Sequence, residues 1–321
     1  MKLSKNGGDI KEFLIQYLIC PSCLPKEKSL DAKIQKIDRS RNNDIVSGEL
    51  HCPKCKRVFK IRDGIAYLQV DHDGHGMRYE DSDMVNRYLL SHYSDILDSV
   101  KSNSEPFFWA SLLETGFLSS LDAGCSVGRL VFEMGNKSCW AVGCDLSERF
   151  IGAAHNLMKN RCLKFSLPIE GNIREMYNAI MPDCWRTDNV EFIVADAQYL
   201  PFRRETFQQV SSLNLLDRVQ YPLAHLYEMN RVASQKNASF LFADPFSWLT
   251  SPAPEERWLG GSAIGDYAGR GKDIVENLMQ GKDSILMPAW KIDKTGQHRW
   301  SLRTHQNHME LIFSDFMVAR R

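Results

Sequence analysis

The sequence predicts an α/β protein in which a small zinc ribbon precedes a doubly wound, mainly parallel sheet. Three observations support this fold class. Two Cys-x-x-Cys pairs lie near the N-terminus. An apolar run that begins at Phe117 ends in a small-residue turn, which a helical pattern follows. Later apolar runs end in polar side chains at Asp145, Asp196 and Asn214, as strands of an open α/β sheet do near a ligand site.

The first element is the metal-binding ribbon, whose candidate ligands are Cys20, Cys23, Cys52 and Cys55. Each pair forms a short knuckle, and the 28 residues between the pairs let both knuckles reach one tetrahedral Zn²⁺. Because all four ligands are thiolates, we expect the zinc to be structural, with no position left for an activated water. Four unrelated buried cysteines or a redox pair are the alternatives. The other five cysteines show no such pairing.

A hairpin should close the ribbon, because the alternating run from Val58 is followed by the turn Asp63-Gly64 and a second short apolar run. Two Cys-Pro-x-Cys pairs followed by Asp63-Gly64-Ile65 resemble the small zinc-ribbon subunit that binds and stabilises several tRNA, rRNA and protein methyltransferases. The resemblance covers about seventy residues. It implies that such a module is fused here to a second domain in one chain.

Composition is typical of a globular protein: 43% of the 321 residues are hydrophobic and 25% are charged. No apolar run reaches the roughly 18 to 20 residues of a membrane span, and residues 1–9 lack the apolar core of a signal peptide. Unpaired cysteines beside a zinc site fit a cytoplasmic location. Residues 1–70 hold 14 Lys and Arg against 8 Asp and Glu, so the ribbon is modestly basic and the remainder modestly acidic.

We expect a zinc ribbon over residues 1–70, a linker and leading helix over 71–105, and the sheet domain over 106–321. The segment from Asp71 to Gly76 is typical of a linker, and Met84 to Leu97 has helical spacing. Residues 163–188 carry no motif and are interpreted as an insertion before the third strand. Residues 245–271, which are rich in proline, glycine and tryptophan, suggest a lid or cavity wall.

The turn after the first sheet strand indicates which cofactor binds. A dinucleotide fingerprint needs glycine at three positions that are here Gly124, Ser126 and Arg129. Glycine instead returns at Gly128, and Asp122 precedes the loop, a pattern that suits a nucleoside–amino-acid ligand. The segment resembles the glycine loop of class I S-adenosylmethionine methyltransferases, although Ser126 stands where that family often has glycine. The resemblance implies S-adenosylmethionine as the cofactor.

Three later strand ends complete the expected cofactor site. Asp145, followed by Leu146, ends the second strand 23 positions after Asp122, where a carboxylate can accept the ribose hydroxyls. In the family resembled, the acid at the position of Asp196 bonds the adenine amino group and the residue at Ala197 contacts the ring. Asn214 ends the fourth strand. Any one of these side chains could instead cap a loop.

The acceptor side also has a resemblance. The stretches 214–219, 244–248 and 258–261, together with Tyr88 and His92-Tyr93, resemble the ovothiol-pathway mercaptohistidine N-methyltransferases. This likeness implies a small polar acceptor, plausibly an imidazole- or thiol-bearing amino-acid derivative. The implied catalytic residues, which would position or deprotonate the acceptor, are His92, Tyr93 and Asp217. The implied substrate contacts are Tyr88, Arg218, Trp248 and Arg303.

Several interpretations of these residues stay open at this point. Residues 303–308 depart from the pattern of that family. Trp248 could be core or lid packing, Asp217-Arg218 a helix-start charge pair, and His92 a structural histidine. An RNA or ribosomal-protein methyltransferase is the first alternative, although no basic run or aromatic–basic alternation favours nucleic acid. A noncatalytic cofactor- or partner-binding protein is the second. The oligomeric state is unknown.

Overall fold

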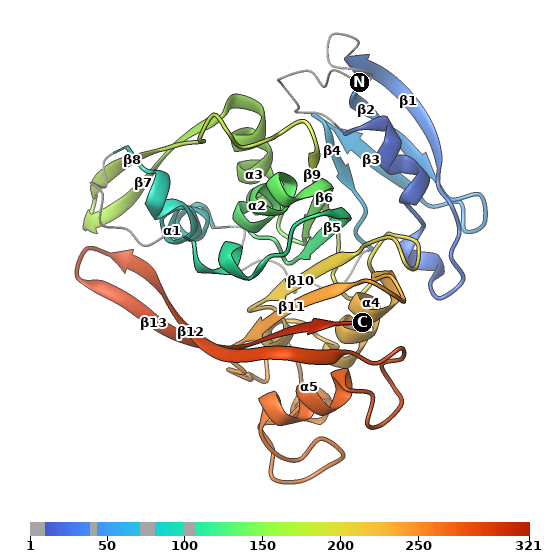
Figure 1. The fold of residues 1–321 in the computed structure, drawn as a ribbon. Helices are drawn as coiled ribbons and strands as arrows, with labels where there is room; N and C mark the ends of the chain where they lie inside the picture. Colours follow the sequence, from blue (N-terminus) through green and yellow to red (C-terminus); the bar gives the residue numbers. More distant parts are fainter. Residues whose placement is uncertain (1–9, 39–43, 71–80, 99–106) are drawn as a thin grey trace.

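The computed structural model describes residues 10–38, 44–70, 81–98 and 107–321, and it is built around one large mixed sheet (Figure 1). Its eleven strands run in the order β1-β2-β3-β4-β9-β6-β5-β10-β11-β13-β12. The expected linker Asp71 to Gly76 lies outside the described residues. Within them, no helix is long and apolar enough to cross a membrane.

The N-terminal strands form an antiparallel ribbon that confirms the predicted hairpin. β3 and β4 pair across Asp63 and Gly64, whose φ angles of 51° and 80° are those of a tight turn. β4 then pairs in parallel with β9, placing Ala66 beside Ile193. The ribbon elements are η1 (Glu12–Tyr17), η2 (Pro21–Cys23), β1 (Asp31–Asp38), β2 (Asp44–His51), β3 (Val58–Arg62) and β4 (Ile65–Tyr67).

The central strands are parallel, and in chain order they stand third, second, first, fourth and fifth across the sheet. This arrangement places the reversal of strand order between β5 and β10, which is where open α/β sheets bind ligands. Their bounds are β5 (Phe117–Ala123), β6 (Ser138–Asp145), β9 (Val190–Val194), β10 (Gln209–Leu213) and β11 (Ser239–Asp244).

Helices cover both faces of this sheet, as the prediction of a doubly wound fold requires. Adjacent strand residues enter different cores: Ile193 belongs to the cluster that includes side chains of α4 and α5, whereas Phe192 belongs to the cluster that includes side chains of α1, α2 and α3. The helices are α1 (Ser82–Tyr93), α2 (Arg129–Lys137), α3 (Glu148–Asn160), α4 (Pro222–Val232) and α5 (Gly271–Met279). Short 3₁₀ turns are η5 (Ser94–Ile96), η6 (Phe108–Leu112), η7 (Leu216–Arg218) and η8 (Glu255–Arg257).

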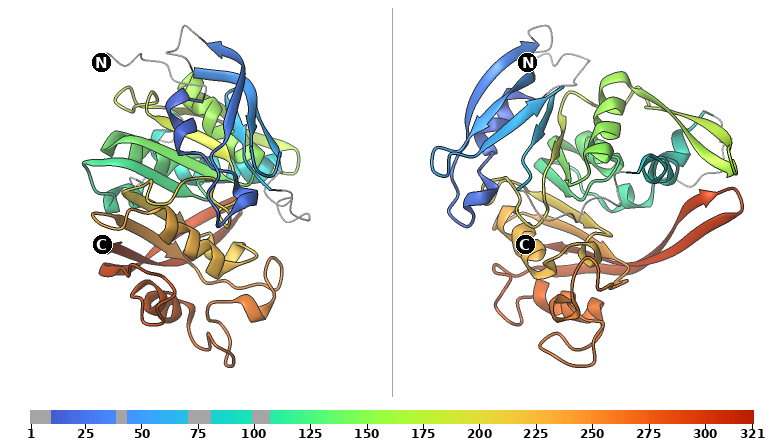
Figure 2. Two further views of the ribbon diagram at one scale, coloured as in Figure 1. Left: turned by 90° about the vertical axis from the view of Figure 1, so that its right-hand side faces the viewer. Right: turned by 180° about the vertical axis from the view of Figure 1, so that it is seen from behind.

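Two hairpins extend beyond the central sheet on the side away from the ribbon (Figures 1 and 2). β7 (Cys162–Glu170) and β8 (Ile173–Ile180) form a separate two-stranded sheet between α3 and β9, within the segment expected to be an insertion. β12 (Lys291–His305) and β13 (His308–Arg320) form the long second hairpin, and β13 runs antiparallel to β11. β12 contacts α1 and β7, so the hairpins and α1 surround one region.

Candidate active site

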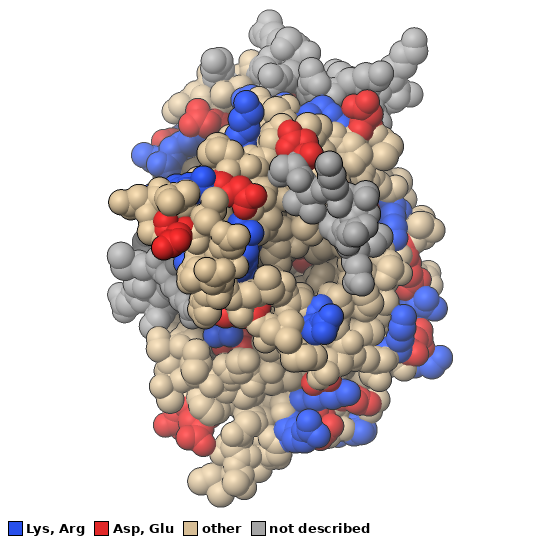
Figure 3. Space-filling model, turned by 90° about the vertical axis from the view of Figure 1, so that its left-hand side faces the viewer, with Lys and Arg blue, Asp and Glu red and all other residues tan. Residues whose placement is uncertain are grey.

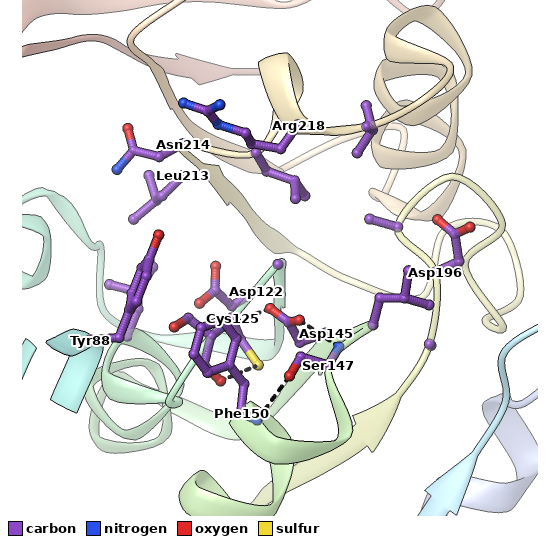
Figure 4. A pocket seen from close by; sticks show the side chains of 18 of the residues that line it. Tyr88, Asp122, Cys125, Asp145, Ser147, Phe150, Asp196, Leu213, Asn214 and Arg218 are labelled. Carbon is purple, nitrogen blue, oxygen red and sulfur yellow. Dashed lines mark hydrogen bonds between the residues drawn. The ribbon is translucent and has the colours of Figure 1, made fainter. Parts of the chain in front are cut away.

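The principal cavity lies at the carboxyl ends of β5, β6, β9 and β10, at the reversal of strand order (Figure 4). The face shown in Figure 3 is hollowed near its centre, and acidic and basic side chains are interspersed over it. Of the residues expected to bind the cofactor, eight line the cavity: Asp122, Gly124, Ser126, Asp145, Leu146, Asp196, Ala197 and Asn214. The sheet therefore brings together side chains that are distant from one another in the sequence.

The glycine loop has the backbone that its small residues permit. Gly124 and Gly128 have φ angles of 75° and 81°, which lie in the left-handed region that favours glycine. Ser126 also has a positive φ of 49°, and its buried hydroxyl oxygen has no hydrogen-bond partner among the described residues. A buried polar atom of this kind needs a partner, so the loop fits a polar ligand. A Cβ at Gly124 would approach the Leu215 side chain to 2.7 Å, which leaves little room for a larger residue.

Asp145 is held by the loops on both sides of it. Its Oδ2 accepts a hydrogen bond of 2.9 Å from Ser126 N, and its Oδ1 accepts one of 2.9 Å from Ser147 N. Ser147 in turn caps α3, since its Oγ accepts from Phe150 N at 3.2 Å. A carboxylate can accept about four hydrogen bonds, so these two backbone contacts do not prevent Asp145 from accepting from ligand hydroxyls.

Asp122 lies deeper in the same wall. Its Oδ1 accepts a 2.5 Å hydrogen bond from Ser211 Oγ. Burial raises the pKa of Asp122 to about 7; the Ser211 bond opposes that shift and the nearby charge of Asp145 adds to it. Asp122 therefore titrates near neutrality, and a cationic ligand group beside it would favour its charged form.

The far end of the cavity follows β9. Asp196 Oδ1 accepts from Gln198 N at 2.8 Å, which forms a tight turn after the strand. His225, on α4, lies 3.1 Å from the Ala197 carbonyl oxygen through Nδ1 and 2.8 Å from Ser212 Oγ through Nε2. This buried histidine fixes the backbone at Ala197, so the turn presents a rigid edge to the cavity.

A second cavity of about 400 Å³ adjoins the first. Five residues line both cavities: His92, Phe107, Trp109, Asn214 and Trp300. Phe108 and His298 stack in the second cavity at a centroid distance of 4.0 Å, so part of its wall is aromatic. Basic side chains of Arg299 and Arg303 also line it.

Sequence reasoning missed most of this second cavity. Phe107, Phe108 and Trp109 form an aromatic run before β5, which was the one local signal available. His298 and Trp300 lie far later in the chain on β12, in a stretch where no motif points to them. Their contact with the aromatic run depends on the antiparallel return of β13 beside β11.

His92 lies between the two cavities. Its Nδ1 is buried and has no hydrogen-bond partner in the described part of the chain. Burial lowers the pKa of His92 to about 4, and the charge of Arg129 contributes to that shift. The imidazole is therefore neutral at physiological pH. Arg129 donates a hydrogen bond of 3.0 Å to the His92 carbonyl and pairs with both Asp95 carboxylate oxygens at 2.5 and 2.9 Å. These contacts stabilise the C-terminal end of α1.

Three of the remaining expected acceptor residues reach a cavity. Tyr88 and Arg218 line the first one, and Arg303 lines the second. Arg303 Nη2 lies 2.5 Å from Tyr177 Oη and 3.3 Å from Glu175 Oε2, whereas its buried Nε has no partner among the described residues. The substrate contacts expected at Tyr88, Arg218 and Arg303 thus lie on cavity walls.

Four expected site residues lie behind the cavity walls. Tyr93 is fully buried and donates from Oη to the Val127 carbonyl at 2.7 Å. Asp217 Oδ2 accepts from Ser247 N at 3.0 Å inside the core. Trp248 stacks on Trp258 at a ring-centroid distance of 6.1 Å. Gly128 packs against Phe192 so closely that a Cβ at this position would meet the ring. Within residues 245–271, the segment expected to form a lid or cavity wall, Pro252 lines the first cavity.

The four ribbon cysteines converge as a metal site requires. Their sulfur atoms all lie within 4.8 Å of one another, with Cys20–Cys55 at 3.6 Å and Cys23–Cys52 at 3.7 Å. A tetrahedron with Zn–S bonds of about 2.3 Å has edges of about 3.8 Å, so the spacing fits Zn²⁺. Three of the four cysteines are buried. This donor set is compatible with a structural zinc ion.

Comparison with protein families agrees with both parts of the site. The model described as Trm112p-like protein matches residues 11–64. The model described as methyltransferase domain matches residues 121–238, a range that contains the glycine loop and the four strand ends lining the cavity. The chain is an S-adenosylmethionine-dependent methyltransferase. It combines a class I methyltransferase fold with an N-terminal Trm112p-like module.

Solved structures similar to this methyltransferase include three with related descriptions. An S-adenosylmethionine-dependent methyltransferase from Methanosarcina mazei has 16% identity and a TM-score of 0.42, covering 68% of this chain and 99% of that one. A putative methyltransferase from Bacillus halodurans has 14% identity and a TM-score of 0.39, covering 66% and 96%. Magnesium protoporphyrin IX methyltransferase from Synechocystis, with bound cofactor, has 14% identity and a TM-score of 0.37, covering 75% and 98%. No curated protein matches the chain.

Proposed function

We propose that this methyltransferase acts on a small polar acceptor, plausibly an imidazole- or thiol-bearing amino-acid derivative, held in the second cavity. The observation that carries the proposal is the shared wall between the cavities, formed by residues such as His92 and Asn214. A volume of about 400 Å³ lies within the range of small-molecule sites. The cofactor residues are those that line the first cavity, with Asp145 on the ribose.

When bound, S-adenosylmethionine supplies an electrophilic methyl group, so the protein needs to align the acceptor and exclude water. Aromatic side chains around the second cavity provide a dry wall for a planar acceptor. Neutral His92 offers an unpaired ring nitrogen at the boundary, where it would position the acceptor through a hydrogen bond while solvent takes the proton that the acceptor loses. This role replaces those expected for Tyr93 and Asp217, which lie behind the wall.

Charge in the second cavity supports an acceptor with a carboxylate. Asp95, its acidic lining residue, is already paired with Arg129. Arg299 and Arg303 contribute two cationic side chains, and Arg303 Nε is a buried donor in need of a partner. An amino-acid derivative would satisfy that donor. Beside the four proposed zinc ligands, five cysteines form no disulfide, which fits a reducing compartment, for which we propose the cytoplasm.

The competing proposal is a nucleic-acid or ribosomal-protein acceptor, which the basic first seventy residues favour. On the face shown in Figure 3, however, the basic side chains drawn in colour are interleaved with acidic ones and form no continuous patch. Phosphate-backbone binding relies on clustered Lys and Arg. The hollowed face therefore suits a small ligand better.

Transfer of a labelled methyl group to a pool of small metabolites, total RNA and ribosomal protein tests the proposal. We expect label in the small-molecule fraction, little change in rate between about 50 and 200 mM salt, and loss of transfer in an Asp145→Ala variant. His92→Gln should lower kcat while leaving the affinity for S-adenosylhomocysteine unchanged. Label found only in macromolecules, with a steep fall in rate over the same salt range, would contradict the acceptor class.

A further inference from the structure

We infer that Asn214 and Arg218 form a carboxylate-binding subsite on the wall of the first cavity opposite Asp122 and Asp145. In Figure 4 the Asn214 and Arg218 side chains lie on one side of the cavity, with the Arg218 guanidinium directed toward Asn214, and the two acids lie on the other side. The subsite adds a specific contact to the proposed function. Its role in binding the acceptor rests on that proposed function. Trp300 and Ser314 orient the Asn214 side chain, and the sequence alone predicts a role for neither residue.

The orientation of the Asn214 amide is fixed by a chain of hydrogen bonds. Trp300 Nε1, which can only donate, lies 3.0 Å from Ser314 Oγ. Ser314 is fully buried, and its hydroxyl lies 2.5 Å from Asn214 Oδ1. Because the hydroxyl oxygen accepts from the indole, its own proton goes to Asn214 Oδ1. A flipped amide would leave that buried proton without an acceptor among the described residues. Asn214 therefore presents its NH₂ group to the cavity.

Backbone geometry also holds Asn214 in place. The residue follows β10 with a φ of 56°, a left-handed conformation that asparagine tolerates better than most residues. Its backbone N donates to the Ala243 carbonyl at 2.7 Å. Asn214 lines both cavities, so its amide group lies where cofactor and acceptor meet.

Arg218 supplies the charge of the subsite. Its Nε lies 3.2 Å from Asp217 Oδ1, and that carboxylate is fully buried beneath it. Asp217 is fixed by Ser247 N at 3.0 Å, and its Oδ1 makes no hydrogen bond among the described residues, so it faces the guanidinium as an ion-pair partner. The two terminal nitrogens form no hydrogen bond within the described part of the chain, and they remain for a ligand. This arrangement makes Asp217 a positioning residue for Arg218.

A carboxylate is the ligand group that fits these donors. Both donor groups are planar, and a guanidinium with an adjacent amide matches the two oxygens of a carboxylate. Asp122, Asp145 and Asp196 line other parts of the cavity and would repel an anion there. The group could belong to the methionine portion of the cofactor or to the acceptor, and two binding measurements distinguish these sources.

The first measurement compares S-adenosylhomocysteine with 5′-methylthioadenosine, which lacks the amino-acid portion, by calorimetry on the full chain. The variants are Asn214→Asp, which keeps the bond from Ser314 but presents an oxygen, and Arg218→Gln. If the carboxylate is the cofactor's, both variants weaken S-adenosylhomocysteine about tenfold or more and leave methylthioadenosine unchanged.

The second measurement uses protein saturated with S-adenosylhomocysteine and titrates imidazole-4-acetate, 4-methylimidazole and histamine, which share a ring but carry different charges. If the carboxylate is the acceptor's, wild-type protein prefers imidazole-4-acetate about tenfold or more, and both variants abolish that preference. Ser314→Ala should reduce it partially, because the freed amide can flip. Ser212→Ala, a buried serine on β10 that bonds His225, is the matched control and should not change it.

The inference is overturned if neither variant reduces the affinity for S-adenosylhomocysteine and neither removes a preference for the anionic imidazole. It is also overturned if the variants lower the affinity for all ligands equally, because that result would show a general disruption of the cavity. The first measurement requires no acceptor. The subsite can therefore hold even if methyl transfer to small metabolites is not observed.

Discussion

Gly128 shows how one residue serves the site without facing the ligand. Its φ is 81°, and a Cβ at this position would lie 2.5 Å from the ring of Phe192, which is fully buried. The glycine lets the start of α2 approach β9 closely, which holds the loop against the sheet. The sequence predicted a cofactor contact here, whereas the structure gives a packing reason for the same residue.

We predict that Gly128→Ala destabilises the protein by about 2–5 kcal/mol, from the left-handed backbone and the clash with Phe192. Gly152→Ala is the control, because Gly152 lies within α3, has no positive φ, and leaves open space around the position that a Cβ would take. Alanine there should stabilise by up to about 1 kcal/mol. Equilibrium unfolding in denaturant measures both changes, and equal effects of the two variants would refute this explanation.

His225 provides a test by pH. Burial lowers its pKa to about 4, although its bond to the Ala197 carbonyl opposes the shift. Below about pH 6.5 the unfolded chain takes up a proton that the folded chain refuses, so this contribution to stability falls between about pH 6.5 and 4. It is fully present at higher pH.

We therefore predict that the stability difference between wild type and His225→Gln shrinks by about 2 kcal/mol from pH 7.5 to pH 5. Groups with the opposite sign, such as Asp122 and Glu191 with pKa values raised to about 7 by burial, are common to both proteins and largely cancel in the difference. Unfolding free energies at the two pH values measure it. A difference that does not vary with pH would show that His225 is not held neutral.

At the scale of elements, the cysteine knuckles carry the clearest prediction. Cys52 is buried, and Cys52 and Cys23 lie within one core cluster together with Leu50 and Phe59. Replacing Cys52 with serine removes one of four thiolates and leaves a polar group in that core. We expect less than one equivalent of zinc and lower stability, because binding free energy of a structural metal is folding free energy.

Metal analysis together with thermal unfolding checks this prediction. Cys139→Ser is a suitable control, since Cys139 is exposed and lies on β6 away from the knuckles. It should keep full zinc and the wild-type unfolding temperature. Full zinc and unchanged stability in Cys52→Ser would remove the cluster as the metal site.

Elements whose signals are local were predictable, and contacts between distant elements were not. β10 runs from Gln209 to Leu213 and ends immediately before Asn214, the polar residue that was expected to end the fourth strand. Asp145 at the end of β6 and Asp196 just after β9 were predictable in the same way, because each follows a short apolar run. Trp300, in contrast, faces the site only through the pairing of β12 with β13. Tyr93 looked like a site residue beside His92, yet helix geometry turns adjacent residues to different sides.

At the scale of the whole molecule, ribbon and methyltransferase strands form one sheet. β4 pairs with β9, and Ile61 and Leu68 lie in the same core cluster as Ile193 and Phe202. Buried ion pairs cross the same boundary: Lys11 pairs with Glu191, and Glu27 lies 3.2 Å from Arg231. The domain boundaries at residues 70 and 105 stay a prediction. In the described chain, residues before and after these boundaries pack in the same hydrophobic core. Loss of zinc should consequently lower the stability of the entire chain.

The whole-molecule arrangement also explains why two cavities meet. The parallel strands place the proposed cofactor residues at one edge, whereas the antiparallel pair β13 and β12 brings His298 and Trp300 across to α1 and the aromatic run at Phe107. The boundary is formed by Asn214 and His92, which come from opposite sides. We propose that methyl transfer takes place across this boundary.

A crystal structure of the protein with S-adenosylhomocysteine tests that claim most directly. We predict the ribose on Asp145, the adenine beside Asp196 and Ala197, and the sulfur directed toward the boundary formed by His92 and Asn214. The second cavity should remain open beyond the sulfur. A ligand bound outside the carboxyl edge of β5, β6 and β9, or a sulfur directed away from the second cavity, would contradict the account.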